Sequence, residues 1–133
     1  MSSVAYQGEP GAWSEQAALD FFGRDAQPAP KSTFDDVFDA VASGECGFGC
    51  VPVENSLAGS IHRNYDLLMR HSLRVIGETI VRVRWCLITQ PGVRLTDLTA
   101  VQSHWQALAQ VERTLGKLLP TVTRREVYDT AGS

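Results

Sequence analysis

The sequence lacks any apolar run that approaches the roughly 18 residues of a membrane span, and it begins without the basic and apolar segments of a secretion signal. These absences predict a soluble, cytoplasmic protein that does not enter a membrane. Positive charge is also lacking: the formal net charge is −3, which gives no global attraction for nucleic acid or anionic lipid. Any anionic ligand must therefore be held by local groups.

Cysteine is scarce, and the count of three is odd, which does not suggest a disulfide framework. Cys46 and Cys50 lie in or beside a strand-like apolar run, and Cys86 lies further along the chain. We predict that these residues are buried thiols in a reducing compartment. The spacing Cys46-x-x-x-Cys50 is not of the CxxC type and has no histidine close by, so no metal site is expected.

Several catalytic signatures are absent as well. The chain has no GxGxxG fingerprint, Walker loop, HExxH pair or GxSxG elbow. His104 adjoins Ser103, but neighbouring residues on a helix do not face each other, so a hydrolase triad is not expected.

What the sequence does contain is a repeated alternation of short apolar strands with amphipathic helices. With 133 residues, 44% hydrophobic and 20% charged, the chain is long enough to bury a globular core. Strands are expected at residues 3–7, 48–53, 79–90, 98–103 and 121–128, and the run at 48–53 should be covered on both faces. A loop interrupted by prolines is expected before Ser32.

Helical spacing follows most of these strands. One helix should begin with Ser14 as its N-cap and end at Gly23, and a second should follow a capping box of Ser32 and Asp35 and stop at Gly44. A third is expected from Ser60 to His71, and a fourth should run for about four turns from His104. The region after Tyr128 looks like the start of another helix.

This order predicts an α/β fold with a largely parallel sheet. Short strand-helix units give way near residues 75–79 to a longer strand, which suggests two lobes, residues 1–76 and 77–133. In such folds the strand-to-helix junctions meet at the carboxyl edge of the sheet, where ligands bind.

Small polar residues collect at these junctions: Ser14, the segment 54–60, the segment 103–106 and the segment 129–133. A serine at a helix start is more often a cap than a ligand contact, because capping alone is worth about 1 kcal/mol. Three consecutive polar residues, Glu54, Asn55 and Ser56, exceed what capping requires. Helix N-termini that face one site can hold a carboxylate or phosphate without basic side chains.

Motifs spread over nearly the whole chain resemble the catalytic domain of the prephenate dehydratase family. They are "VAYQGEPGAWSEQAA", "GFGCVPVENSLAGSI", "YDLL", "LRVIGE", "CLI", "VQSHWQALAQVERTL" and "DTAGS", in the family's order and spacing. The resemblance implies a two-lobed fold like that of type II periplasmic binding proteins. It also implies decarboxylating dehydration of prephenate, a small-molecule substrate, to phenylpyruvate in phenylalanine biosynthesis, with no metal or organic cofactor. Members of the family are typically oligomers, so a homo-oligomer is expected.

The resemblance also implies roles for individual residues. Catalytic roles fall to Glu54, Asn55 and Thr130, although Glu54 could instead orient its neighbours. The residues expected to bind substrate are Ser14, Ser56, Gly59, Ser60, Ser103, His104, Gln106, Gln110, Ala131 and Gly132.

The sequence departs from the family pattern at several points. Trp105 replaces a usual proline, and Trp85 stands where a histidine often precedes "CL". The family's Thr-Arg-Phe element, its return to the first lobe and its ACT domain have no counterpart here. We therefore expect an incomplete catalytic domain that is inactive or weakly active alone, and that associates with itself or with a separate chain. Two alternatives stay open: an arogenate dehydratase, and a noncatalytic dicarboxylate-binding fragment.

Overall fold

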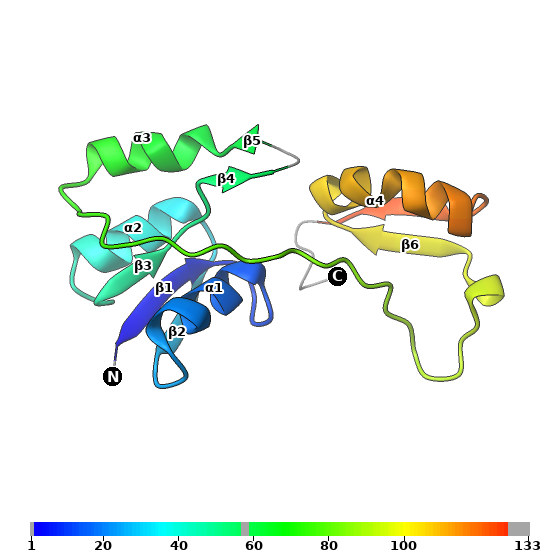
Figure 1. Cartoon of the computed structure of the whole chain (residues 1–133), viewed down its shortest axis with the longest axis horizontal. Helices are drawn as coiled ribbons and strands as arrows, with labels where there is room; N and C mark the ends of the chain where they lie inside the picture. The colour runs from blue at the N-terminus through cyan, green and yellow to red at the C-terminus, as the bar shows by residue number, and fades with distance from the viewer. Residues whose placement is uncertain (1, 57–58, 128–133) are drawn as a thin grey trace. The chain divides into compact units, whose positions relative to one another are not determined.

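The computed structural model describes residues 2–56 and 59–127, and it divides the chain into two compact units, Met1–Arg82 and Val83–Ser133 (Figure 1). The lobe boundary expected after residue 76 stays a prediction. Each unit contains a parallel sheet with at least one helix packed on it, so the predicted α/β class is confirmed.

The first unit is built on a three-stranded parallel sheet in the order β2-β1-β3. Its elements are β1 (Ser3–Gln7), α1 (Trp13–Phe22), β2 (Gln27–Lys31), α2 (Phe34–Ala42), β3 (Phe48–Cys50), β4 (Glu54–Asn55), β5 (Gly59–Ser60) and α3 (His62–Arg70). The first predicted strand is confirmed with its bounds, and the expected strand at 48–53 is regular only over its first three residues.

The core of this unit lies on both faces of the sheet, because successive residues of a strand point to opposite sides. Val4 packs with Ala18 of α1 on one face, and Ala5 packs with Val37 of α2 on the other. Phe48 and Cys50 join the α1 side, so β3 is covered by a helix on each face, as predicted.

The prediction of a proline-interrupted loop before Ser32 is wrong, because Pro28 and Pro30 belong to β2 at the edge of the sheet. The Gln27 N–H donates to the Ser2 carbonyl at 2.9 Å, and the Lys31 carbonyl accepts from Gly8. Alternate residues therefore face β1, and the two prolines turn their nitrogens to the open side, where no ladder bond is lost.

Two predicted helix caps are also wrong. The N-cap of α1 is Ala12, and Ser14 lies inside the first turn, which the Glu15 carboxylate closes by accepting the Gly11 N–H at 2.6 Å. The capping box of α2 is Thr33 with Asp36, one residue later than expected. Gly44 does end this helix, in the left-handed region with φ 80°.

The second unit is a smaller β-α-β arrangement. It contains a 3-10 turn η1 (Leu95–Asp97), β6 (Ala100–Ser103), α4 (Trp105–Leu118) and β7 (Thr123–Glu126), and β6 pairs with β7 in parallel. Leu108, Leu115 and Leu119 form its core, with Val101 of β6 packed against them. The helix expected after His104 is confirmed, and β6 and β7 lie within the strands expected at 98–103 and 121–128.

The long strand expected at Thr79–Gln90 is wrong, because the segment pairs with no other strand in the described part of the chain. The alternation behind that expectation is visible in the burial: Val81, Val83 and Trp85 are half-buried, whereas Arg82 and Arg84 are exposed. Cys86 is exposed as well, so only Cys46 of the three thiols is fully buried. None of the helices in residues 2–56 and 59–127 has the length and apolarity to span a bilayer.

Candidate functional site

The polar segment after β3 forms a small antiparallel hairpin, which the sequence did not predict. Glu54 pairs with Ser60 and Asn55 with Gly59, and Gly59 has φ 82°, a conformation that favours glycine. The Ile61 N–H donates to the Val53 carbonyl at 2.9 Å and extends this ladder. We call residues 53–56 and 59–61 the β4–β5 hairpin.

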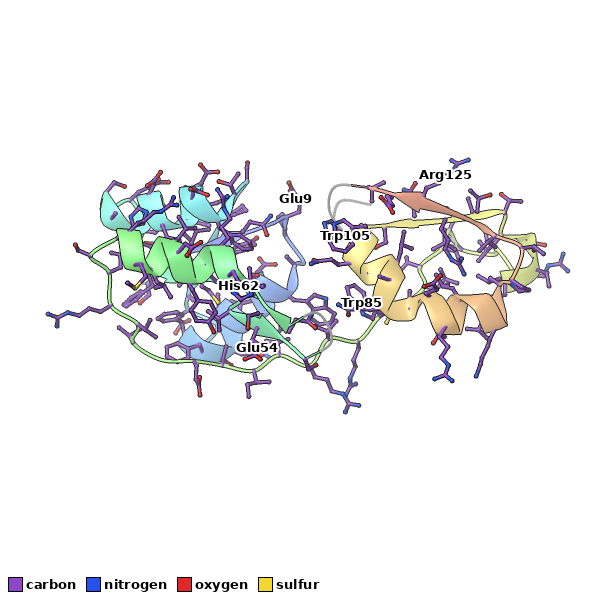
Figure 2. All side chains as sticks on the ribbon, turned by 90° about the horizontal axis from the view of Figure 1, so that it is seen from above. Glu9, Glu54, His62, Trp85, Trp105 and Arg125 are labelled. Atoms are coloured by element: carbon purple, nitrogen blue, oxygen red, sulfur yellow. The ribbon has the colours of Figure 1, made fainter. Side chains whose placement is uncertain are left out.

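The hairpin corrects the expected start of the third helix at Ser60, because Ser60 belongs to β5. The helix α3 begins at His62, its N-cap is Ile61, and no side chain caps it. The side chains of Glu54, Ser56 and Ser60 are exposed, and Asn55 is half-buried (Figure 2 labels Glu54). Capping of α3 therefore does not account for these polar residues.

Asn64 fixes the strand that leads into this hairpin. Its side chain has no exposed surface, and its Nδ2 donates to the Pro52 carbonyl oxygen at 2.7 Å. Sequence reasoning placed no role on Asn64, because its partner lies on another element. A polar residue on the face of α3 that also carries Leu67 was the available signal.

Tyr6 stands near the carboxyl end of β1 and was also not singled out. Its side chain is fully buried, and its hydroxyl has no hydrogen-bond partner among the described residues. Burial raises the pKa of Tyr6, and the negative charges of Glu15 and Glu9 raise it further, so the phenol stays protonated at neutral pH.

In the second unit, the predicted residues gather around the junction of β6 and α4. Ser103 is the last residue of β6, and His104 is the N-cap of α4, where its Nδ1 accepts from the Gln106 N–H at 3.3 Å. The adjacent Trp105 is 56% exposed, and its ring lies beside that of His104 (Figure 2 labels Trp105). Because His104 caps the helix, its imidazole acts locally as a hydrogen-bond acceptor.

Gln110 is held by a residue that the sequence did not link to it. The Trp85 indole nitrogen donates to Gln110 Oε1 at 3.0 Å. Gln110 lies one turn after Gln106 on α4, so this bond fixes one side chain of the predicted set and leaves its amide NH₂ as the donor end. Thr130, Ala131 and Gly132 lie outside the described residues.

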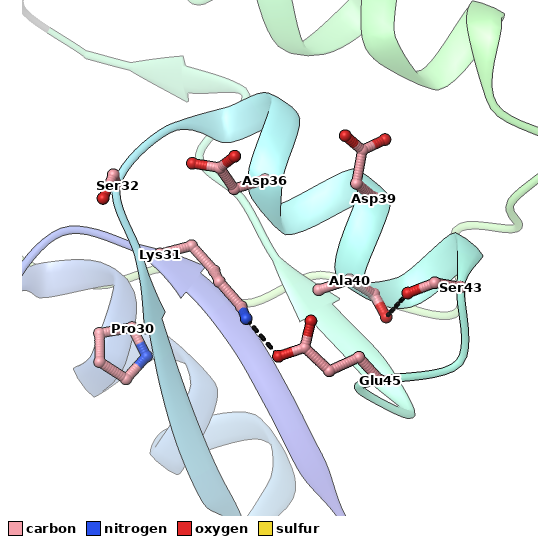
Figure 3. Close-up of a pocket in the computed structure, with 8 residues that line it drawn as sticks. All are labelled: Pro30, Lys31, Ser32, Asp36, Asp39, Ala40, Ser43 and Glu45. Atoms are coloured by element: carbon pink, nitrogen blue, oxygen red, sulfur yellow. Dashed lines mark hydrogen bonds and ion pairs between the residues drawn. The ribbon is translucent and has the colours of Figure 1, made fainter.

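An open groove of about 390 Å³ runs along α2 and β2, at a different place from the predicted residues (Figure 3). Asp36, Asp39 and Glu45 line it, and Lys31, its cation, is bound to Glu45 at 2.5 Å. Three carboxylates against one paired ammonium disfavour a dianionic ligand. No group of three metal-ligating side chains lies together within the described ranges.

Parallel sheets with polar residues after their strands define the class of open α/β proteins, which bind ligands at that edge. Within this class, the family model for prephenate dehydratase matches residues 4–133. The chain belongs to the prephenate dehydratase family.

Similar proteins agree with this assignment. Arogenate dehydratase 3, chloroplastic, of Arabidopsis thaliana is 52% identical over 130 residues, which are 98% of this chain and 30% of that protein. Arogenate dehydratase/prephenate dehydratase 6, chloroplastic, of the same plant is also 52% identical, over 98% of this chain and 31% of its own length. The chain therefore spans less than a third of these two relatives.

Two solved structures share the fold. The prephenate dehydratase of Arthrobacter aurescens, in complex with L-Phe, superposes with a TM-score of 0.90 at 28% identity, covering 98% of this chain and 44% of that one. GqqA, described as a novel type of quorum-quenching acylase, superposes with a TM-score of 0.84 at 33% identity, covering 98% of this chain and 46% of its own.

Proposed function

We propose that this chain is part of a catalytic domain that converts prephenate to phenylpyruvate, with release of water and carbon dioxide. The observation that carries the proposal is the family match over residues 4–133, which includes the polar residues of the β4–β5 hairpin and those at the start of α4. The family supports a carbon–oxygen lyase.

The reaction asks little covalent chemistry of the protein. The ring hydroxyl takes up a proton and leaves as water, the ring carboxylate leaves as carbon dioxide, and the electron pair of the broken carbon–carbon bond completes the aromatic ring. Positioning the substrate and supplying the proton are the tasks of the enzyme. We propose catalytic roles for Glu54, Asn55 and Thr130, of which Glu54 and Asn55 belong to the hairpin.

Substrate recognition is a matter of holding two carboxylates. The first turn of α4 carries the positive end of the helix dipole and backbone N–H groups without a partner inside the helix, of which that of Gln106 donates to His104 Nδ1. Ser103 and Gln106 add neutral side-chain donors beside it. Such groups bind a dianion without a basic side chain. In this proposal the remaining binding residues are Ser14, Ser56, Gly59, Ser60, His104, Gln110, Ala131 and Gly132.

Arogenate is the second candidate substrate. It carries an amine where prephenate carries a keto group, and its product would be phenylalanine. Relatives named as arogenate dehydratases, at 52% identity, favour testing it alongside prephenate. The polar residues of the described segments are compatible with either ligand, because both share the ring carboxylate and hydroxyl.

The test is calorimetric titration of the chain with prephenate and with arogenate, in parallel with product analysis by alkaline absorbance for phenylpyruvate and by amino-acid analysis for phenylalanine. We expect a dissociation constant below 1 mM for at least one ligand, which corresponds to a binding free energy on the order of −4 kcal/mol or more favourable. Asn55→Ala and Gln106→Ala should weaken it about tenfold, whereas Gln102→Ala, on β6, should not. Absence of binding to both ligands would overturn the proposal.

The expected assembly forms part of the same proposal. We propose two lobes resembling type II periplasmic binding proteins, in a homo-oligomer. The expected cytoplasmic location stays a prediction, and the two Arabidopsis relatives are named chloroplastic. Sedimentation velocity at micromolar concentration tests the assembly, and a monodisperse monomer would contradict it.

A further inference from the structure

Asn64 occupies a position where an apolar side chain would be expected. It has no exposed surface, and it shares the buried face of α3 with Leu67, which is 2% exposed. Its Oδ1 is buried and has no hydrogen-bond partner among the described residues. A half-satisfied buried amide destabilises a core relative to a well-packed apolar side chain. The presence of Asn64 at this buried position must therefore be explained by its other polar group, the Nδ2 amide nitrogen.

The Nδ2 group donates to the Pro52 carbonyl oxygen at 2.7 Å. Pro52 follows β3 and lies two residues before Glu54, where the chain leaves the sheet. The next carbonyl, that of Val53, accepts from Ile61 at 2.9 Å, and Glu54 then pairs with Ser60. Three successive residues of the outgoing strand are thus tied to the segment that opens α3.

The three ties differ in what anchors them. The two backbone ties join the hairpin to itself, so they fix its shape. The Asn64 bond joins Pro52, the residue just before the hairpin, to the packed face of α3, which is held by buried side chains. It therefore sets where Glu54 and Asn55 stand relative to the core.

We propose that Asn64 is the positioning residue of the candidate site: through the Pro52 carbonyl it holds the β4–β5 hairpin, and with it Asn55, in place on the first unit. Its relevance to substrate rests on the proposed function, whereas its hold on the hairpin does not. Asn64 itself touches no reacting group.

The first test is hydrogen exchange by NMR on the ¹⁵N-labelled chain. In Asn64→Leu and in the nearly isosteric Asn64→Asp, the amides of Asn55, Gly59 and Ile61, which occupy the hydrogen-bonded positions of the ladder, should exchange about fivefold faster relative to those of β1, as expected for loss of one hydrogen bond. Leu67→Ala, on the same helix face, is the matched control, and it should change the hairpin and β1 together. Equal relative exchange in all variants would overturn the proposal.

A measurement on the unmutated chain covers the case in which the variants do not fold. One of the two Nδ2 protons of Asn64 should exchange at least tenfold more slowly than the side-chain amide protons of the exposed Gln106. Rapid exchange of both Asn64 protons would contradict the bond on which the proposal depends.

The second test is ligand binding under conditions where each variant is folded. Asn64→Leu should weaken prephenate or arogenate binding about fivefold or more, and Leu67→Ala should leave it within twofold. A loosened hairpin with unchanged affinity would overturn the role of Asn64 in the site. If the unmutated chain binds neither ligand, the proposed function fails, and the exchange data still decide whether Asn64 positions the hairpin.

Discussion

Gly49 of β3 packs against Val37 of α2 so closely that a β-carbon at Gly49 would lie 3.2 Å from Val37 Cγ1. The same β-carbon would lie 3.1 Å from Cγ2 of Val41, one turn further along the helix. Both neighbours are β-branched and stiff about χ1, and Val37 is 1% exposed, so neither side chain moves aside easily. The absence of a side chain at Gly49 lets α2 approach the sheet.

Gly49→Ala should therefore destabilise the first unit, by about 1–3 kcal/mol as for other overpacked cores. Urea unfolding followed by circular dichroism measures the change. Gly47→Ala is the control, because its β-carbon would meet nothing closer than the Ser3 carbonyl oxygen at 3.8 Å. A Gly49→Ala protein as stable as Gly47→Ala would contradict this packing.

The ion pair between Asp35 and Arg63 connects α2 with α3 and should make their association dependent on pH. The hydrogen bond from the Arg63 guanidinium holds the pKa of Asp35 below its ordinary value. A carboxyl group whose pKa is lowered in the folded state stabilises the fold at every pH above its ordinary pKa, which is about 3.9 for Asp. This stabilisation is lost as the pH falls through the lowered pKa.

The stability difference between the natural chain and Asp35→Asn should thus be largest near neutral pH and should vanish in acid. Because both side chains are solvent-accessible, added salt should reduce the difference as well. A double-mutant cycle with Arg63→Gln isolates the pair. A coupling that stays constant from pH 7 to pH 3 would show that the charges do not interact in solution.

The three cysteines should react at very different rates with a thiol reagent such as Ellman's. Cys86 is exposed, Cys46 is buried, and burial raises the pKa of Cys50, which lowers its thiolate fraction. We expect one fast thiol per chain at pH 8 and two that react at least tenfold more slowly. Cys86→Ser should abolish the fast phase and Cys50→Ser should leave it. A fast phase that persists in Cys86→Ser would contradict the assignment.

The first strand, the β-α-β order of the second unit and the helix that begins after His104 could be predicted because each follows a local pattern. Other elements could not. Pro28 and Pro30 indicated a loop, but a strand at the edge of a sheet uses only every second N–H for hydrogen bonds to its neighbour, so prolines fit at the alternate positions. Residues 79–90 alternate as a strand does, but alternation reports which side chains face a core, and a strand also needs a partner. The β4 and β5 strands have two residues each, too short for any periodicity.

The candidate site shows the same division. The family resemblance predicts roles for Glu54, Asn55 and Gln110 from their local motifs, and these roles stay predictions. The residues that hold these motifs were not identified, because Asn64 contacts Pro52 twelve residues away and Trp85 contacts Gln110 twenty-five residues away. Such pairs become visible only when folding has brought the elements together.

The bond between Trp85 and Gln110 gives a further prediction for the second unit. Trp85→Phe keeps an aromatic ring but removes the indole N–H that donates to Gln110 Oε1. We expect this change to weaken the packing of α4 by about 1 kcal/mol, the typical net value of one hydrogen bond, seen as faster amide exchange along that helix. Trp105→Phe, at a side chain that is 56% exposed, should change it by less than about 0.5 kcal/mol.

A double-mutant cycle distinguishes the hydrogen bond from simple ring packing. In the Trp85→Phe background, Gln110→Ala should lower the stability only by the loss of its apolar contacts, because its hydrogen bond is already gone. The coupling between Trp85 and Gln110 should therefore be about 1 kcal/mol, as for other neighbouring residues that share one bond. The corresponding cycle with Trp105 should give none. Strictly additive effects of Trp85→Phe and Gln110→Ala would show that Gln110 is not held by the indole, and its amide would then be free to turn.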